Sequence, residues 1–312
     1  MGKVCFGIDI GGTAVKVGLF STEGKLLNKW DFATRKTNGE ESILTDTASF
    51  VLEKARELKL DKKDILGVGV GIPGPVKENG EVLELANLAL ERMNIEDELE
   101  KLMGLKVKAG NDANVAALGE YWVGGGKGYK NLVFITLGTG VGGGIILNGS
   151  VLAGSNGAAG EIGHILVNEE ETKVCGCGKK GCLEQYASAT GIVRIATNIL
   201  AENAEPSSMR SYTELSAKTI FDCAKEEDKL ALQVVEKSCR YLGIAMAHVA
   251  QVIDPEVFVI GGGVSKAGEI ITETTKKYFN ANVMNALKNK EFKLATLGND
   301  AGIYGAAKLI LG

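Results

Sequence analysis

The sequence lacks several features that would assign it to a common class of protein. No apolar stretch reaches the roughly 18 residues that a transmembrane helix requires. Lys and Arg form no block, and the formal net charge is −4, which argues against a nucleic-acid partner. The chain does not open with a charged segment followed by an apolar one, so we expect no secretory leader. These absences predict a cytoplasmic protein without a membrane or nucleic-acid partner.

The Walker A pattern G-x-x-x-x-G-K-[ST] is also absent, although glycine is frequent, with 42 residues. Glycines concentrate instead in residues 134–144, FITLGTGVGGG, between two apolar runs. A backbone with so few Cβ atoms can approach a ligand closely and direct several N–H groups at phosphate oxygens. The following segment, IILNGS, is typical of a strand and turn, whereas a dinucleotide-binding motif needs a helix there. We therefore predict a phosphate-binding hairpin.

A second copy of this hairpin lies near the start of the chain. Residues 4–27 contain an apolar strand, the turn Gly11-Gly12-Thr13, a returning strand and a polar turn. GNDANVAALG at 110–119 and GNDAGIYGAA at 298–307 form a further repeat, in which the Asp can cap the helix that follows. A chain of 312 residues is long enough for two domains. The repeats indicate two related halves around a cleft that holds a phosphate-bearing ligand.

The remaining segments alternate between helices and strands. Periodic apolar residues predict helices over 40–60, 96–103, 113–123 and 300–311, and apolar runs predict strands over 65–72, 107–110 and 257–260. The strand 65–72 ends at Pro73-Gly74-Pro75. In open α/β sheets, ligands bind beyond the carboxyl ends of such strands.

The six cysteines divide into two sets. Three lie in apolar segments and are predicted to be reduced core residues, namely Cys5, Cys223 and Cys239. The others, Cys175, Cys177 and Cys182, lie among glycines, and His164 precedes them. Disulfides within this set would leave one thiol unpaired, and the spacing differs from the commoner C-x2-C pairs. Three thiolates and one imidazole can occupy all four coordination positions of a tetrahedrally bound ion. We therefore hypothesise a structural zinc site in the loop 164–182.

Two carboxylates lie where phosphoryl transfer would need them. Asp112 follows the strand 107–110, and a carboxylate there could accept the proton of an attacking hydroxyl. From the residues alone, capping of the next helix explains Asp112 equally well. Asp9 and Thr13 flank the first glycine turn, where Asp can hold Mg²⁺, directly or through water, and Thr13 and Lys16 can meet phosphate oxygens. A solvated strand lysine explains Lys16 equally well.

Seven short motifs follow one another along residues 9–265. They are DIGGT at 9–13, GIPGPV at 71–76, GNDAN at 110–114, LGTGVGGG at 137–144, GEIGH at 160–164, CGCGKKGCLE at 175–184 and IGGGVS at 260–265. With these motifs the sequence resembles the ROK family of the sugar kinase, heat-shock ATPase and actin superfamily, and most closely its bacterial glucokinases. The resemblance implies a duplicated ribonuclease-H-like α/β fold with two domains around a nucleotide and sugar cleft. Residues 1–115 with 300–312 would form the smaller domain, and 116–299 the larger.

The resemblance also implies an activity, the ATP-dependent phosphorylation of a hexose at its 6-hydroxyl, with glucose as the expected substrate. Asp112 then becomes the expected catalytic base, because the family's base lies in the first Asn-Asp pair. Six positions match the hexose-binding set: Asn87, Asn111, Asp112, Glu161, His164 and Glu184. Twelve match contacts to Mg-ATP: Asp9, Gly11, Gly12, Thr13, Lys16, Thr136, Gly138, Thr139, Gly140, Gly261, Gly262 and Gly263. For the last three, an ordinary strand-to-helix turn is the alternative.

The same resemblance supports zinc at His164, Cys175, Cys177 and Cys182. One imidazole nitrogen of His164 would bind the zinc ion and the other a sugar hydroxyl. The apolar segment around His248 predicts packing in the core or at an interface. This segment and the homodimeric assembly that is usual in the family together suggest a homodimer.

Three alternatives stay open. After Asn87 the family commonly has a glycine or proline and then a tryptophan, whereas this sequence has Leu88-Ala89-Leu90. Another hexose could therefore be preferred, such as N-acetylmannosamine, N-acetylglucosamine, fructose or allose. A polyphosphate-using kinase would keep the sugar residues. A non-catalytic sugar sensor or repressor is less expected, because a DNA-binding helix-turn-helix would precede the first glycine turn and only eight residues precede Asp9.

Overall fold

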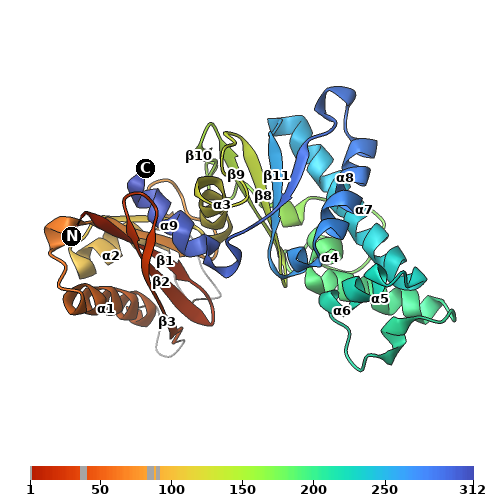
Figure 1. Ribbon diagram of the computed structural model, residues 1–312, viewed down its shortest axis with the longest axis horizontal. Helices are drawn as coiled ribbons and strands as arrows, with labels where there is room; N and C mark the ends of the chain where they lie inside the picture. The colour runs from red at the N-terminus through yellow and green to blue at the C-terminus, as the bar shows by residue number, and fades with distance from the viewer. Residues whose placement is uncertain (1, 36–40, 83–87, 89–91) are drawn as a thin grey trace. The chain divides into compact units, whose positions relative to one another are not determined.

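The computed structural model describes residues 2–35, 41–82, 88 and 92–312. The chain forms two compact units. Unit 1 comprises Met1–Gly128, Gly144–Gly160 and Leu297–Gly312, and unit 2 comprises Tyr129–Gly143 and Glu161–Thr296. Two mixed five-stranded sheets and their helices confirm the predicted α/β fold class (Figure 1).

The first sheet has the strand order β3-β2-β1-β4-β7. Its strands are β1 (Val4–Ile10), β2 (Ala14–Ser21), β3 (Leu26–Ala33), β4 (Ile65–Ile72) and β7 (Val107–Asn111). The first three are antiparallel, whereas β4 and β7 run parallel to β1. The predicted hairpin at residues 4–27 and the predicted strands 65–72 and 107–110 are thereby confirmed.

The second sheet repeats this arrangement, with the order β10-β9-β8-β11-β12. Its strands are β8 (Leu132–Leu137), β9 (Val141–Leu147), β10 (Ser150–Val151), β11 (Val257–Gly261) and β12 (Glu291–Leu294). In both sheets the third, second, first, fourth and fifth strands stand side by side. The duplication that the glycine turns predict is therefore present in the sheet topology. A separate small sheet pairs β5 (Glu81–Val82) with β6 (Met93–Asn94).

In the part of unit 1 that the structure describes, the α-helices are α1 (Glu41–Glu57), α2 (Ile95–Met103), α3 (Asp112–Trp122) and α9 (Ala301–Leu311). Successive side chains of β1 cover opposite faces of the sheet, as the two-residue period of a strand requires. Phe6 and Ile8 pack in the core that α1 and α2 cover, whereas Cys5 packs with Ile303 and Ala307 of α9. Figure 1 shows α9 lying beside β1 and β2. The central strands are therefore buried on both faces.

The contact between α9 and the sheet requires glycine in the strands. A Cβ on Gly69 of β4 would lie 1.7 Å from the carbonyl oxygen of Ala306. A Cβ on Gly7 of β1 would lie 2.0 Å from that of Ile303. Any side chain at these positions would push the helix off the sheet. The helix that the sequence predicts over 300–311 therefore packs on the first sheet.

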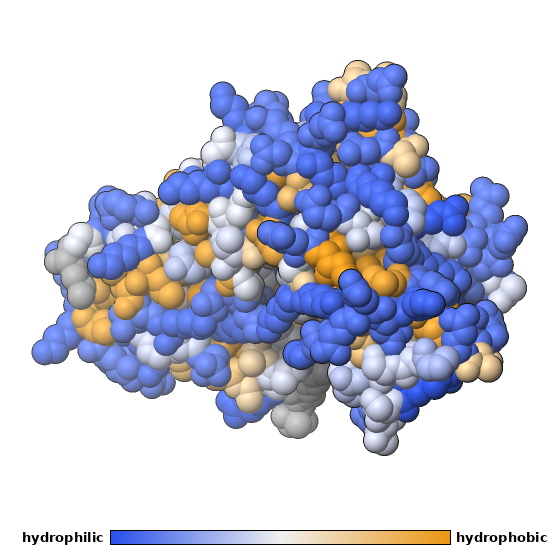
Figure 2. Space-filling view, turned by 45° about the vertical axis from the view of Figure 1, so that its right-hand side comes forward, coloured by the Kyte–Doolittle hydropathy of each residue, from blue (hydrophilic) through white to orange (hydrophobic). Residues whose placement is uncertain are grey.

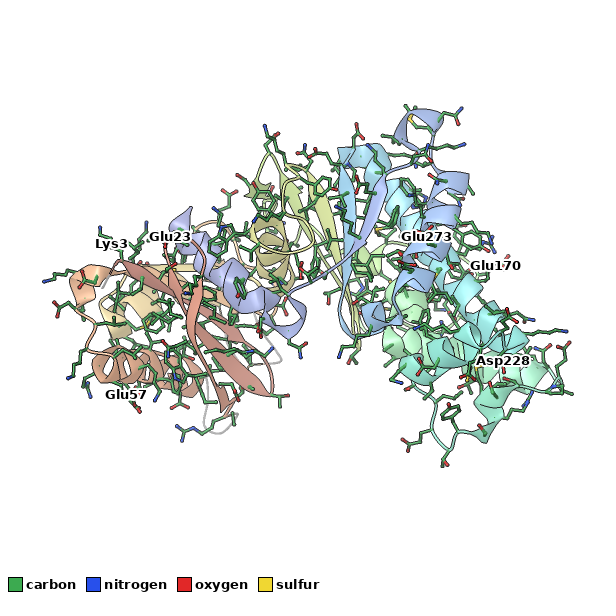
Figure 3. The ribbon with its side chains drawn as sticks, viewed as in Figure 1. Lys3, Glu23, Glu57, Glu170, Asp228 and Glu273 are labelled. Atoms are coloured by element: carbon green, nitrogen blue, oxygen red, sulfur yellow. The ribbon has the colours of Figure 1, made fainter. Side chains whose placement is uncertain are left out.

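Five α-helices belong to unit 2: α4 (Glu184–Ala187), α5 (Ala189–Glu202), α6 (Ala217–Lys225), α7 (Lys229–Ile253) and α8 (Glu269–Asn282). Asp228, labelled in Figure 3, caps α7 by accepting the N–H groups of Leu230 and Ala231 at 3.0 Å. Phe258 of β11 and Phe279 of α8 pack edge to face and join this sheet to its helices. The described 3-10 helices are Lys62–Asp64, Ile162–His164, Ser208–Ser211, Gly263–Ala267, Asn285–Leu287 and Gly298–Asp300.

The three cysteines predicted to lie in the core, Cys5, Cys223 and Cys239, are buried and unpaired. Burial raises the pKa of Cys5 and of Cys239 to about 12, which keeps both thiols protonated. The core prediction for His248 is wrong, because its side chain is exposed on α7. Packing at an interface stays a prediction.

The face that Figure 2 presents is mostly polar, with apolar groups scattered between the charged ones. Among the described residues, Val252 and Met284 are the most exposed large apolar side chains, at 84% and 60%. Of the helices that the structure describes, none combines the length and the apolar character needed to cross a membrane.

Candidate active site

The glycine turn of unit 2 joins β8 to β9 and contains three predicted phosphate contacts. The Gly138 N–H donates to the Gly140 carbonyl at 3.0 Å and closes the turn. Two further bonds attach the turn to the start of α5. The Ala189 N–H donates to the Gly138 carbonyl at 2.8 Å, and the Thr190 hydroxyl donates to the Thr139 carbonyl at 3.0 Å. The carbonyl oxygens of Gly138, Thr139 and Gly140 therefore all accept hydrogen bonds, and these bonds fix the shape of the turn.

The glycine run 261–263 lies beside this hairpin. Because β11 is parallel to β8, Gly261 stands opposite Thr136, another predicted phosphate contact. Gly262 has a φ of 82°, and a Cβ there would lie 2.5 Å from the Leu137 carbonyl oxygen. The positive φ and the close approach to Leu137 both require glycine at position 262. The structure brings these predicted nucleotide contacts together, and the run also forms the strand-to-helix turn of the alternative explanation, since a 3-10 helix follows it.

The first glycine turn, Gly11-Gly12-Thr13, joins β1 to β2 in unit 1. Beside it, Lys16 Nζ lies 3.6 Å from Asp9 Oδ2 and donates to the Asn299 carbonyl at 2.9 Å. Burial raises the pKa of Asp9, and the charge of Lys16 opposes that shift. A Cβ on Gly302 would lie 2.7 Å from Asp9 Cγ, so glycine permits this carboxylate to approach α9. Lys16 is thus an ion-pair partner of Asp9 and not simply a solvated lysine.

Asn111 and Asp112 lie where β7 ends and α3 begins. Asn111 is the helix cap, because its Oδ1 accepts the Asn114 N–H at 3.1 Å. Its Nδ2 donates to the Gly74 carbonyl at 3.1 Å and to Asp112 Oδ1 at 3.0 Å. The prediction that Asp112 caps this helix is therefore wrong. Asp112 is exposed, and its Oδ1 also accepts the Ala113 N–H at 2.7 Å.

The prediction that Asp300 caps the matching helix of the second repeat is wrong as well. Asp300 precedes α9 but makes no side-chain bond to the helix. Its backbone has φ −101° and ψ −7°, whereas a capping residue needs an extended backbone to turn its carboxylate onto the next N–H groups. The carboxylate forms an ion pair with Lys29 of β3 instead.

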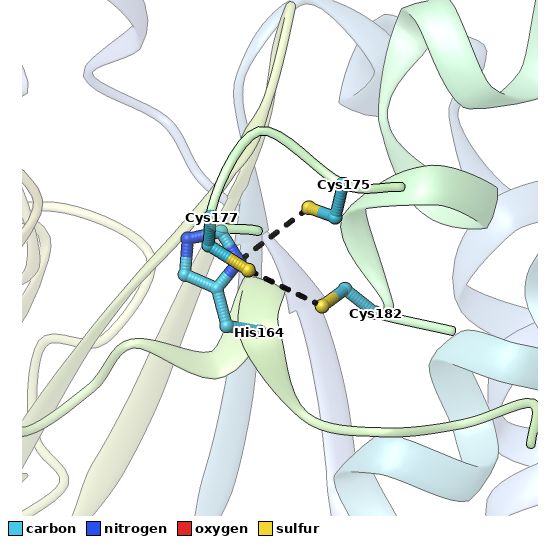
Figure 4. A group of neighbouring side chains, drawn as sticks. All are labelled: His164, Cys175, Cys177 and Cys182. Carbon is cyan, nitrogen blue, oxygen red and sulfur yellow. Dashed lines mark hydrogen bonds between the residues drawn. The ribbon is translucent and has the colours of Figure 1, made fainter. Parts of the chain in front are cut away.

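His164, Cys175, Cys177 and Cys182 converge in unit 2, as Figure 4 shows. Each offers one ligand atom, and the four atoms all lie within 4.8 Å of one another. Cys175 Sγ is 3.9 Å from His164 Nδ1, and Cys177 Sγ is 3.6 Å from Cys182 Sγ. The structure thus brings together all four residues that the sequence nominates as metal ligands.

The protein environment acts differently on two of these thiols. A hydrogen bond from the Lys179 N–H lowers the pKa of Cys177. Burial raises the pKa of Cys182 to about 12, and its neighbouring thiols add to that shift. Without a cation, three thiolates cannot share so small a volume, since like charges disfavour one another. The donor set therefore fits a soft divalent cation that would deprotonate all three thiols.

Glu184 connects this cluster to the glycine turn. Its Oε2 accepts the Val141 N–H at 3.0 Å, and its Oε1 lies 3.9 Å from Cys175 Sγ. A Cβ on Gly140 would lie 2.4 Å from Glu184 Oε2. Glycine at 140 therefore makes room for this carboxylate, a role that the sequence does not reveal.

The predicted hexose residues divide between the units. Glu161, His164 and Glu184 lie around the cluster of unit 2, where Glu161 Oε2 is 4.0 Å from His164 Nε2. Asn111 and Asp112 lie together in unit 1. Asn87 lies outside the described residues, as do Ala89 and Leu90.

Sequence reasoning missed the residues that hold the cysteine loop. Glu171 accepts hydrogen bonds from the Tyr186 hydroxyl at 2.6 Å and from Arg194 at 2.8 Å. Gln185 bridges the two ends of the loop, because it accepts the Cys182 N–H at 3.1 Å and donates to the Lys173 carbonyl at 2.9 Å. Apart from the bond between Cys182 and Gln185, which spans three residues, these bonds join residues 12 to 23 apart, beyond the reach of a local spacing rule.

Comparison with known proteins places this arrangement in a family. The ROK family matches residues 5–312. The chain belongs to the ROK family. This ROK-family chain is 44% identical over 309 residues to a glucokinase of Halalkalibacterium halodurans, covering 97% of this chain and 94% of that protein. It is 32% identical to the N-acetylgalactosamine kinase AgaK of a Shewanella species, covering 97% and 96%.

A solved structure is similar over almost the whole chain. It is a ROK family glucokinase from Streptomyces griseus in complex with glucose and AMPPNP. The TM-score is 0.78 and the sequence identity 34%, and the match covers 98% of both chains. The ROK-family resemblance inferred from the motifs is confirmed.

Proposed function

We propose that this protein transfers the γ-phosphoryl group of ATP to the 6-hydroxyl of a hexose, with glucose as the preferred substrate. The observation that carries the proposal is the match, over 98% of both chains, to a ROK family glucokinase bound to glucose and AMPPNP. The two glycine turns and the exposed Asp112 carboxylate support it.

Asp112 is the proposed catalytic base. The attacking hydroxyl must lose its proton during the transfer, and a positioned carboxylate can accept it. Because Asn111 caps α3, the helix does not need the Asp112 carboxylate for that purpose. Asn111 donates to the same carboxylate and fixes its orientation.

The phosphate groups would be bound by the two glycine turns, with Thr136 and Thr139 from unit 2 and Thr13 and Lys16 from unit 1. Backbone N–H groups in such turns favour anionic oxygens. Asp9 would hold the Mg²⁺ that accompanies ATP, a role that suits an oxygen ligand. The run 261–263 would lie against the adenosine.

Zinc is the proposed ion at the cysteine cluster. With bonds of about 2.0–2.3 Å, the ligand atoms of a tetrahedral zinc ion are separated by roughly 3.3–3.8 Å. The Cys177–Cys182 pair at 3.6 Å falls in that range, and the Cys175–His164 pair at 3.9 Å lies just beyond it. When bound, the ion would fix the loop. His164 Nδ1 faces Cys175 and would take the metal, which leaves Nε2, near Glu161, for a sugar hydroxyl.

The test is ADP release with Mg-ATP against glucose, mannose, fructose, allose and the N-acetylated hexosamines, with a sugar-free control. We expect glucose to give the highest kcat/KM, and phosphorus NMR to show the ester at the 6-position. If no sugar accelerates ADP release over the control, the kinase proposal is wrong.

Another hexose is the second candidate, favoured by the 32% identity to the N-acetylgalactosamine kinase. The phosphate-binding residues would be unchanged, so only the sugar panel separates the two. An N-acetylated hexosamine as the best substrate would select this candidate. Polyphosphate in place of ATP, with the sugar phosphate measured instead of ADP, tests the polyphosphate-using alternative.

We also propose domain boundaries, assembly and location. Residues 1–115 with 300–312 would be the smaller domain and 116–299 the larger. A homodimer would cover exposed residues of α7, including His248 and Val252. Light scattering on the purified protein would show a mass of about twice 32.9 kDa. A reducing cytoplasm would keep the cluster's thiols available for the metal.

A further inference from the structure

The peptide planes of the glycine turn have a defined direction. In a trans peptide the carbonyl of one residue and the N–H of the next point in opposite directions. The Gly138 carbonyl is bonded to the Ala189 N–H, and the Thr139 carbonyl to the Thr190 hydroxyl. The N–H groups of Thr139 and Gly140 therefore point away from α5. Two successive N–H groups on one side form an anion-binding concavity.

The carbonyl of the second peptide is held by a side chain, the Thr190 hydroxyl, whereas that of the first is held by a backbone N–H. The second peptide joins Thr139 to Gly140, and a glycine adopts conformations that other residues do not. If this peptide flipped, the Thr139 carbonyl would replace the Gly140 N–H on the anion-binding side. A carbonyl dipole there repels phosphate. The Thr190 hydroxyl, at 3.0 Å from the Thr139 oxygen, opposes that flip.

The segment 184–190 holds the turn at both ends. Glu184 Oε2 accepts the Val141 N–H at 3.0 Å, just after the turn, and the Ala189 N–H donates to the Gly138 carbonyl at its start. Between these two contacts, the structure records a side-chain donor to the turn. It is the Thr190 hydroxyl, which donates to the Thr139 carbonyl. Thr190 itself is exposed and contributes little to the core. Its Oγ1 also lies 3.0 Å from the Oγ of Ser188, the cap of α5, so its bond to Thr139 couples the turn to the start of that helix.

We infer that Thr190 is a positioning residue for nucleotide binding, which keeps the Thr139–Gly140 peptide in its anion-binding orientation. The inference rests on the proposed function, because it assumes that the turn binds the phosphates of ATP. Thr190 would not touch the reacting atoms. It would act through the backbone of the turn.

The experiment compares Thr190→Val, which keeps the shape and removes the hydroxyl, with Thr190→Ser, which keeps the hydroxyl. Thr197→Val is the matched control, because Thr197 lies exposed on the same helix and bonds only within it, to the Val193 carbonyl. Loss of one neutral hydrogen bond predicts an increase of about three- to tenfold in KM and in the calorimetric Kd for Mg-ATP in Thr190→Val. The KM for the hexose and the Tm should match wild type, Thr190→Ser should restore ATP affinity, and Thr197→Val should not change it.

Wild-type ATP affinity in Thr190→Val overturns the inference, as does an equal loss in Thr197→Val or a failure of Thr190→Ser to restore binding. Failure of the proposed function is a different result, because the wild-type protein would then bind no ATP at all.

Discussion

One carboxylate oxygen of Glu120 accepts the backbone N–H of Leu297 at 2.8 Å. The other accepts the Gly125 N–H at 2.7 Å, and the side chain is fully buried. Gly125 lies just before the first point where the chain leaves unit 1, and Leu297 lies where it last returns. Glu120 therefore joins, within unit 1, two segments that are far apart in the sequence.

Glu120→Gln should destabilise unit 1. The amide has one acceptor oxygen, and its NH₂ would face a backbone N–H, so one buried donor loses its partner. The expected loss is about 1–3 kcal/mol in the free energy of unfolding by urea. Glu57→Gln is the control, because Glu57 lies exposed at the end of α1 (Figure 3). Hydrogen exchange should increase at residues 125 and 297 in Glu120→Gln alone. Unchanged exchange there would contradict this role.

Glu171 should make the free energy of unfolding depend on pH in the acidic range. Burial raises the pKa of Glu171, but hydrogen bonds from Tyr186 and Arg194 outweigh it and lower the value from 4.5 to about 2. The stabilisation is therefore complete above pH 4.5 and is lost as the pH falls toward 2. Glu171→Gln should cost about 1.5–3 kcal/mol at neutral pH and flatten the decline in Tm below pH 4.5.

Glu170→Gln is the matched control for this change, since Glu170 is the neighbouring residue and its side chain is exposed (Figure 3). It should leave both the Tm and its pH dependence as in wild type. Equal effects of the two substitutions would show that Glu171 has no special contribution.

The cysteine cluster should hold one zinc ion per chain. Cys177→Ser removes one ligand, and we expect the zinc content measured by plasma mass spectrometry to fall well below one. Cys223→Ala, at a buried thiol of α6, should keep the full content. Chelation should also weaken hexose binding, because His164 would lose its fixed orientation. Wild-type sugar affinity after complete chelation would refute the link between metal and sugar.

Asp112→Asn should reduce kcat by about 10²- to 10⁴-fold, the range that a general base supplies, with hexose binding largely retained. Asp300→Asn is the comparison at the matching repeat position, where the carboxylate pairs with Lys29. It should leave kcat near wild type. A comparable fall in kcat for both would remove Asp112 as the base.

The sequence was informative where chemistry depends on residues close together in the chain. The cysteine loop is such a case, since its three thiols lie within eight residues and glycines let the loop fold around one point. Both glycine turns are another, because apolar runs on either side of a glycine turn predict a hairpin locally. The shared strand order of the two sheets follows from the same repeats.

What the sequence could not predict are contacts whose partners are distant in the chain. Thr190 and Thr139 are 51 residues apart, and Lys29 and Asp300 are 271 apart. The capping errors have the same origin. G-N-D-A permits either Asn or Asp to cap, and the preceding backbone decides between them: a strand precedes α3, whereas a 3-10 helix precedes α9. Gly140 and Gly302 also have roles set by distant carboxylates, Glu184 and Asp9.

The packing of α9 on β1 and β4 imposes an order on synthesis. Residues 301–311 cover one face of strands that the ribosome makes much earlier, by almost 300 residues for β1 and by about 230 for β4. Until α9 is made, Cys5 and Phe20 lack Ile303 and Ala307, the α9 residues with which they form a buried cluster, so this apolar face stays incompletely covered. Unit 2 is completed earlier in translation, because its last residue is Thr296. The core of unit 1, which contains the first strands to be translated, is therefore the one whose last element is made at the end of synthesis.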